Sequence, residues 1–133
     1  MQIAATAKYV RISPEKVRLV VGQIKKMPPA SAIKVLNFVP KKAAPILKKV
    51  ITSAIANAKN NYGLMEDSLV FKEIQVGKGP MFKRYRPVSR GRVHSILKRT
   101  SHIRVVLEGE QKKQVSEVSK VPEVPEVEKK NDK

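Results

Sequence analysis

The stretch KGPMFKRYRPVSRGRVHSILKRTSHIR, residues 78–104, decides how this chain is organised and what it can bind. It carries nine Lys and Arg side chains, and the chain has no acidic residue between Glu73 and Glu108. Mutual repulsion would keep such a segment from ordering on its own. A dense polyanion would neutralise it, so the stretch predicts contact with nucleic acid.

Strand patterns flank the basic stretch on both sides. Residues 103–107 form one apolar strand, and residues 69–76 alternate, with one face made of Leu69, Phe71, Glu73 and Gln75 and the other of Val70, Lys72, Ile74 and Val76. Turn-forming Pro87, Ser89 and Gly91 lie between the two strands. At ~3.3 Å per residue, a hairpin with ~13 residues per arm reaches ~40 Å, which a small domain cannot cover. We therefore expect a protruding basic β-hairpin at about residues 77–102.

The residues before the hairpin predict an edge strand, from Ile3 to Ile12, and three helices. Ser13-Pro14-Glu15 is a helix start with Ser13 as N-cap, and an apolar face follows at helical spacing: Val17, Val20, Val21 and Ile24. A short helix is expected from about Ser31 to before Pro40. The longest helix is expected from Lys41 to Asn60, followed by a C-cap signal at Gly63. Its apolar stripe consists of Ala43, Leu47, Val50, Ile51, Ala54 and Ala58.

Length and charge indicate one domain with an appended tail. The 133 residues carry a formal charge of +17, all of it on residues 1–108, which hold 22 basic and 5 acidic residues. Residues 109–133 are balanced in charge and repeat Val-Pro-Glu, so we expect a low-complexity, disordered tail there. The chain has no cysteine, no apolar run of about 20 residues and no secretory h-region, which favours a cytoplasmic protein without a membrane span.

Candidate catalytic and cofactor motifs have simpler explanations. Ser13-x-x-Lys16 matches the nucleophile motif of serine acyl-transfer enzymes, but Pro14 marks Ser13 as a helix N-cap. His94 and His102 are two histidines among cations, which is too few ligands for a metal site. Gly77-Lys78-Gly79-Pro80 lacks the further glycine of a nucleotide-binding loop and is expected to loosen the strand where the hairpin leaves the sheet. We therefore expect no enzymatic activity, no metal and no cofactor.

Several motifs resemble those of one known family. They are Ser13-Pro14-x-Lys16-x-Arg18-Leu19-Val20, Pro40-Lys41-Lys42-Ala43-Ala44-Pro45-x-Leu47, Gly79-Pro80, Gly91-Arg92 and Lys98-Arg99-Thr100-Ser101-His102-Ile103. These motifs resemble those of the large-ribosomal-subunit protein family numbered twenty-two, of the bacterial type. They occur in the same order as in that family, over about residues 3–108. The resemblance implies an α+β domain, in which a small three-stranded antiparallel sheet packs on three helices, with a long protruding β-hairpin. It also implies a structural constituent of the large subunit that binds its RNA, aids assembly and lines the polypeptide exit tunnel with the hairpin tip.

The expected RNA-binding residues combine the basic stretch with this resemblance. Phe82 and Tyr85 can stack on bases while arginines bind phosphates. The expected contacts are Lys16, Arg18, Lys78, Lys83, Arg84, Tyr85, Arg86, Arg90, Arg92, Lys98, Arg99, Thr100 and His102. The tunnel tip is expected at Arg86, Pro87, Val88, Ser89, Arg90, Gly91 and Arg92. Expected partners are large-subunit RNA of the 23S type, neighbouring ribosomal proteins and the nascent polypeptide, with no membrane and no homo-oligomer.

Other functional classes remain open on the residues alone. An architectural DNA-binding protein with a basic β-arm is the main alternative, although no dimerisation segment is visible. An enzyme acting on RNA would need clustered carboxylates, and the acidic residues before the tail are Glu15, Glu66, Asp67, Glu73 and Glu108. A membrane-surface role fits poorly, because the basic stretch has extended rather than helical periodicity.

Overall fold

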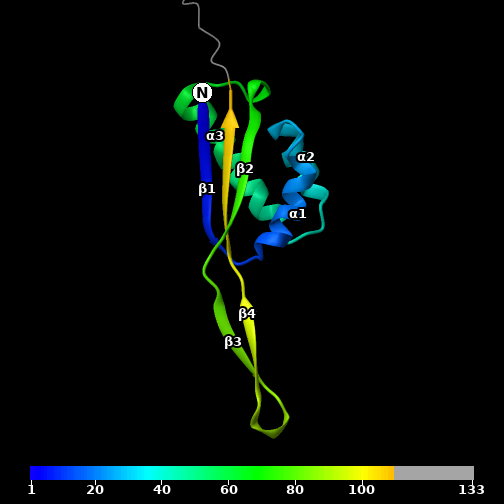
Figure 1. The fold of residues 1–133 in the computed structure, drawn as a ribbon. Coiled ribbons are helices and arrows are strands. Elements are labelled where there is room, and N and C mark those ends of the chain that lie inside the picture. The colour runs from blue at the N-terminus through cyan, green and yellow to red at the C-terminus, as the bar shows by residue number, and fades with distance from the viewer. Residues whose placement is uncertain (110–133) are drawn as a thin grey trace, which may run out of the picture.

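Three strands and three helices form the body of the protein in the computed structural model, which describes residues 1–109 (Figure 1). The strands β1 (Gln2–Val10), β5 (Ser101–Glu108) and β2 (Val70–Lys78) make an antiparallel sheet in that order. The helices are α1 (Pro14–Ile24), α2 (Pro29–Phe38) and α3 (Ala44–Tyr62). The α+β class and the three-stranded sheet on three helices are confirmed.

Helix α3 forms the centre of the hydrophobic core. Its predicted stripe is buried throughout, from Ala43 to Ala58, and α3 packs on β1, β5 and α2 while α1 packs on β2. The predicted C-cap is confirmed, since Gly63 adopts the left-handed conformation (φ 61°) and the N–H groups of Gly63 and Leu64 donate to the carbonyls of Lys59 and Ala58. The helix itself runs to Tyr62, past the expected end at Asn60. The helix begins at Ala44, three residues later than expected, with Pro45 in its first turn.

Two β-bulges change which residues of the strands face the core. In β2 the pairing with β5 shifts between Phe71 and Glu73, so Ile74 and Val76 lie on the same face as Phe71. The predicted strict alternation, which placed Ile74 and Val76 opposite Phe71, is therefore wrong beyond Phe71. The reason is that one extra residue in a strand inverts the inward and outward order of all residues that follow.

The second bulge lies at the end of β1, close to where the hairpin begins. The register moves from Ala7 opposite Ile103 to Val10 opposite Ser101, and Tyr9 has a φ of 57°. This bulge leaves the Tyr9 N–H outside the regular ladder, and it donates instead to Nδ1 of His102 at 3.1 Å. The Tyr9 ring also lies edge-on to the imidazole, with 4.8 Å between centroids. His102 thus stabilises the bulge.

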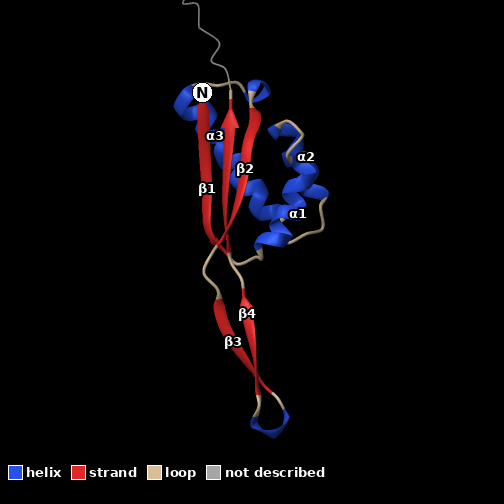
Figure 2. Cartoon of the chain, viewed as in Figure 1, coloured by secondary structure: helices blue, strands red, loops and turns tan. Residues whose placement is uncertain are grey.

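Strands β3 (Phe82–Pro87) and β4 (Val93–Lys98) form a separate two-stranded antiparallel ribbon. Figure 2 shows this ribbon extending away from the sheet and helices, with a single helical turn, Ser89–Gly91, at its tip. We call residues 79–100 the arm. The expected hairpin is present in the structure, but its ladder is shorter than the ~13 residues per strand expected from β geometry, because residues 79–81 and 99–100 interrupt the pairing between β2–β5 and β3–β4.

The predicted tail at 109–133 lies outside the described residues, apart from Gly109. The Gly109 N–H donates to the Met1 carbonyl at 3.2 Å, and the N-terminal amine donates to the Gly109 carbonyl at 2.9 Å. Gly109 therefore extends the pairing of β1 with β5 by one residue past the expected domain boundary.

Thr100 and Ser101 provide a matched pair for a stability prediction. Both are buried, but the Thr100 hydroxyl donates to the Pro80 carbonyl at 2.6 Å, whereas the Ser101 hydroxyl has no hydrogen-bond partner within residues 1–109. We expect Thr100→Val to lower the free energy of unfolding by about 1 kcal/mol, and Ser101→Ala to leave it unchanged or raise it by up to about 1 kcal/mol. Urea unfolding of both variants measures the two effects, and a loss of 1 kcal/mol or more in Ser101→Ala would contradict the assignment.

Candidate nucleic-acid interface

The arm carries positive charge that the described protein leaves without a counter-charge. Every residue of β3 and β4 is exposed. The two ion pairs found in the described part of the chain, Lys59 with Glu66 and Lys72 with Glu108, both lie outside the arm. Since repulsion among these cations favours an external anion, the arm is suited to bind a polyanion.

The register of the ribbon sorts the arm side chains onto two different faces. Arg84 lies opposite Ile96, Arg86 opposite His94 and Phe82 opposite Lys98, and directly paired residues share a face. The six residues of these three pairs therefore lie on one face of the ribbon, which we call the cationic face because it holds Arg84, Arg86 and Lys98. The guanidinium of Arg84 lies over the Phe82 ring, 5.8 Å from its centroid.

The opposite face of the ribbon is mainly apolar. It pairs Tyr85 with Ser95, Lys83 with Leu97 and Pro87 with Val93, so Lys83 is its single cation among the ribbon residues 82–87 and 93–98. Tyr85 is 68% exposed, which leaves its ring free to stack on a flat partner. A nucleic acid against the cationic face would meet phosphate-binding groups, and one against the apolar face would meet stacking surfaces.

The tip turns through residues 88–92, within the segment 86–92 where turn chemistry predicted it. The Val88 N–H donates to the Arg92 carbonyl at 2.9 Å, and two consecutive residues, Arg90 (φ 59°) and Gly91 (φ 67°), adopt left-handed backbone conformations. Gly91 accepts this conformation without cost, whereas Arg90 is held in it by the turn. Arg90 and Arg92 are both exposed at the end of the arm.

Besides Arg84, whose Nη1 donates to the Lys83 carbonyl at 2.8 Å, three residues of the predicted RNA-binding set have hydrogen-bond partners within the protein. Arg18 donates from Nη2 to the Val76 carbonyl at 2.9 Å, which connects α1 to the edge strand β2. Thr100 binds the Pro80 carbonyl, and His102 accepts the Tyr9 N–H. For these three, RNA contact stays a prediction, while their contribution to the geometry of the arm is visible in the structure.

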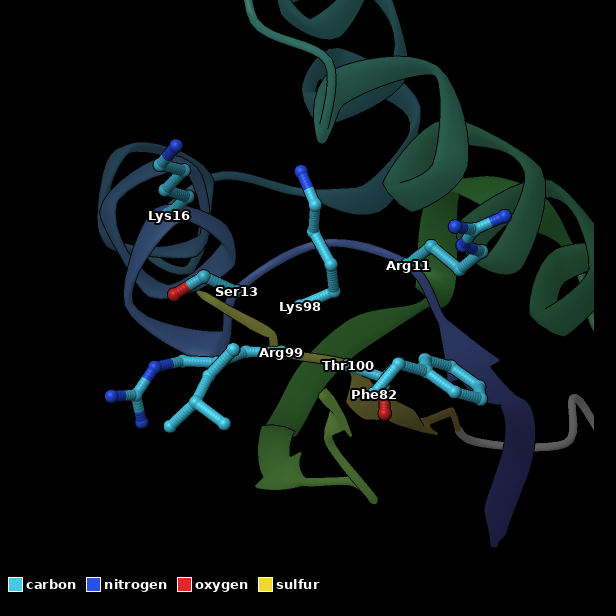
Figure 3. A pocket seen from close by; sticks show the side chains of 8 residues that line it. Arg11, Ser13, Lys16, Phe82, Lys98, Arg99 and Thr100 are labelled. Carbon is cyan, nitrogen blue, oxygen red and sulfur yellow. The ribbon is translucent and has the colours of Figure 1, made fainter. Parts of the chain in front are cut away.

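The start of α1 and the base of the arm enclose a cleft of about 630 Å³, which we call the root cleft. Figure 3 shows the side chains that line it: Arg11, Ser13, Lys16, Phe82, Leu97, Lys98, Arg99 and Thr100. The cleft thus brings together four of the predicted RNA contacts: Lys16, Lys98, Arg99 and Thr100. Lys16 and Lys98 are more than 80 residues apart in the sequence.

Arg11 is the cleft cation that was missing from the predicted set. The signal was present, because Arg11 lies two residues before Ser13 at the predicted helix start, but an isolated arginine at a strand end has no periodic pattern to mark it. Ser13 is the N-cap residue of α1, as predicted. The helix begins at Pro14 as expected, yet the Ser13 hydroxyl makes no capping hydrogen bond.

Residues 1–109 contain neither a cluster of metal-binding side chains nor a membrane-spanning helix. No group of three His, Cys, Asp or Glu side chains that could hold a metal ion occurs there. No helix in the same range is long and apolar enough to cross a membrane.

Two sequence comparisons match this chain to known proteins. The family model described as ribosomal protein L22p/L17e matches residues 5–108. A protein named large ribosomal subunit protein uL22, from Oleidesulfovibrio alaskensis, is 48% identical over 108 residues, which cover 81% of this chain and 98% of that relative. The family is structural rather than enzymatic. With the match running from β1 to the end of β5, this chain belongs to the ribosomal protein L22p/L17e family.

Proposed function

We propose that the protein is a structural component of the large ribosomal subunit that binds large-subunit RNA through its arm. The observation that carries this proposal is the exposed ribbon of β3 and β4, whose cations have no ion-pair partner within the described residues. Family membership supports the ribosomal setting, because the relative is named as a large-subunit protein. Neighbouring ribosomal proteins are further partners in this setting.

The mechanism is charge neutralisation combined with ordering. RNA segments repel one another through their phosphates, and an inserted cationic ribbon lowers that repulsion so that the segments pack closely during assembly. The RNA in turn fixes the arm, which has few contacts with its own domain. The tip residues 86–92 lie farthest along the ribbon (Figure 1), and we propose that they reach the wall of the exit tunnel and face the nascent polypeptide.

Shortening the arm tests this proposal. Replacing residues 83–97 by Asn-Gly would join the paired residues Phe82 and Lys98 through a two-residue hairpin turn. In a chemical footprint on large-subunit RNA, we expect the shortened protein to lose one continuous set of protected nucleotides and retain those made by the body. An unchanged footprint would refute the arm-led binding mode.

Sedimentation of the full-length protein separates RNA binding from the architectural DNA-binding alternative. We expect the full-length protein to sediment with large ribosomal subunits in moderate salt and to be released as salt rises, since each neutralised phosphate adds about one unit to the salt dependence. Recovery of the protein with duplex DNA and not with large subunits would favour the DNA alternative.

A further inference from the structure

We propose that the root cleft is a second RNA-binding site, at the junction between the arm and the body, built to hold the sugar-phosphate backbone of one nucleotide and its neighbouring phosphates. This inference rests on the proposed function, since it takes RNA as the ligand, and it adds a location and a chemical class. The cleft lies where the β1–α1 connection meets the base of β3 and β4, so an RNA strand seated there would contact the body and the arm at once.

The charge of the cleft favours an anion with more than one negative group. Arg11, Lys16, Lys98 and Arg99 all line it, and no carboxylate is among the lining residues. Glu15, the acidic residue in the first turn of α1, is exposed but does not line the cleft. A concave surface lined by one sign of charge focuses its field, which raises the local concentration of the opposite ion.

The directions of these side chains suit a chain-like ligand more than a single ion. In Figure 3, Lys16 and Lys98 extend upward, Arg11 extends to the right and Arg99 to the lower left, so the four cationic groups do not converge on one point. Cations directed at one point would surround one phosphate. Cations spread over a surface match successive phosphates of a strand that passes across it.

The remaining walls of the cleft supply the other contacts that a nucleotide uses. Phe82 offers a ring that is 44% exposed, on which a base can stack. The Ser13 hydroxyl makes no capping bond to α1, so it is available to donate to a phosphate oxygen. The volume of about 630 Å³ lies within the range of roughly 300–1,000 Å³ typical of sites for small organic ligands, which leaves room for a nucleotide.

The first experiment removes charge from the cleft without altering the arm. The full-length variant Arg11→Gln/Lys16→Gln should flatten the slope of log Kd against log salt for a large-subunit RNA fragment by roughly 1.5 units, the amount expected for two lost phosphate contacts. The matched control is Lys25→Gln/Lys26→Gln, which loses the same charge at the other end of α1 and should keep the wild-type slope. All four side chains are exposed, so the thermal stability of both variants should remain that of the wild type.

The second experiment locates the RNA that the cleft holds. The chain has no cysteine, so Ser13→Cys introduces a unique thiol to which an iron chelate can be tethered for hydroxyl-radical cleavage of bound RNA. We expect the cut nucleotides to coincide with the protections that Arg11→Gln/Lys16→Gln loses. They should also differ from the protections lost when residues 83–97 are replaced.

The outcomes distinguish this inference from the proposed function. An unchanged salt slope and footprint in Arg11→Gln/Lys16→Gln, together with lost binding in the arm-shortened protein, would overturn the cleft site and leave the arm intact as a binding element. Failure of the wild-type protein to bind the RNA would overturn both. Saturable binding of adenosine monophosphate that disappears in Arg11→Gln/Lys16→Gln and does not compete with RNA would identify a free-nucleotide site and overturn the RNA assignment.

Discussion

Replacing Arg84, Arg86 and Lys98 by glutamine should flatten the slope of log Kd against log salt by about two to three units for binding to large-subunit RNA. The three residues share the cationic face of the ribbon, two of them opposite Ile96 and His94. Each phosphate contact contributes a slope of roughly 0.7 to 0.9, so three lost contacts weaken binding by roughly a hundredfold or more at 0.1 M salt. Fluorescence anisotropy over a series of salt concentrations measures both quantities.

The control for this prediction keeps the loss of net charge constant. The variant Lys25→Gln/Lys26→Gln/Lys34→Gln removes three exposed cations from the far end of α1 and from α2. It should retain a near-wild-type slope, because those cations are distant from the ribbon. If both triple variants lose the same slope, binding depends on overall charge rather than on the cationic face, and the interface assigned to the arm is incorrect.

The apolar face should respond in a different way. Tyr85→Ala removes a stacking ring without removing charge, so it should lower affinity by roughly 1–3 kcal/mol at every salt concentration and leave the slope unchanged. A change of slope in Tyr85→Ala would show that the variant disturbs the cationic face through the ribbon, and the division into two faces would then be wrong.

The parts of this fold that could be predicted from the sequence are those whose signals are local. The buried stripe of α3 repeats at helical spacing, and Pro14 marks the first residue of α1, so periodicity and turn chemistry were sufficient. The bulges at Phe71/Glu73 and Ala7/Val10 were not predictable in this way. A bulge is decided by how two distant strands pair, and neither strand alone contains that information.

The candidate site shows the same division between local and distant information. The acid-free stretch identified the arm cations directly, because charge can be counted along the sequence. The root cleft depends on the fold to bring Arg11 and Lys16 next to Lys98 and Arg99, which no local pattern encodes. The internal hydrogen bonds of Arg18 and Thr100 could not be predicted either. The sequence alone does not tell whether an arginine or threonine side chain binds RNA or bonds to the backbone of its own domain.

Gly79→Ala should distort the point where the arm leaves the sheet, while Gly77→Ala should be tolerated. A Cβ at Gly79 would overlap the Thr100 hydroxyl and lie 3.3 Å from both the Thr100 carbonyl carbon and Nε2 of His102, whereas one at Gly77 would meet its nearest neighbour at an ordinary 3.9 Å. The Gly79 N–H also donates to the Thr100 carbonyl at 3.0 Å, so the two strands cannot separate there without losing that bond. We expect a loss of about 1–3 kcal/mol in unfolding free energy for Gly79→Ala, and no loss for Gly77→Ala, since alanine is favoured over glycine within a strand.

A second substitution at Thr100 tests whether this overlap is the cause. Thr100→Ala removes the hydroxyl that the new methyl group would strike, so Gly79→Ala/Thr100→Ala should be less destabilised than the sum of the two single variants. Thr100→Val should give no such relief, because its methyl group occupies the place of the hydroxyl. Urea unfolding gives the coupling energy, and RNA footprinting should show that the arm protections weakened in Gly79→Ala recover with Thr100→Ala. Additive effects in the double variant would mean that the steric conflict lies elsewhere, and that the close approach of Gly79 to Thr100 does not set the direction of the arm.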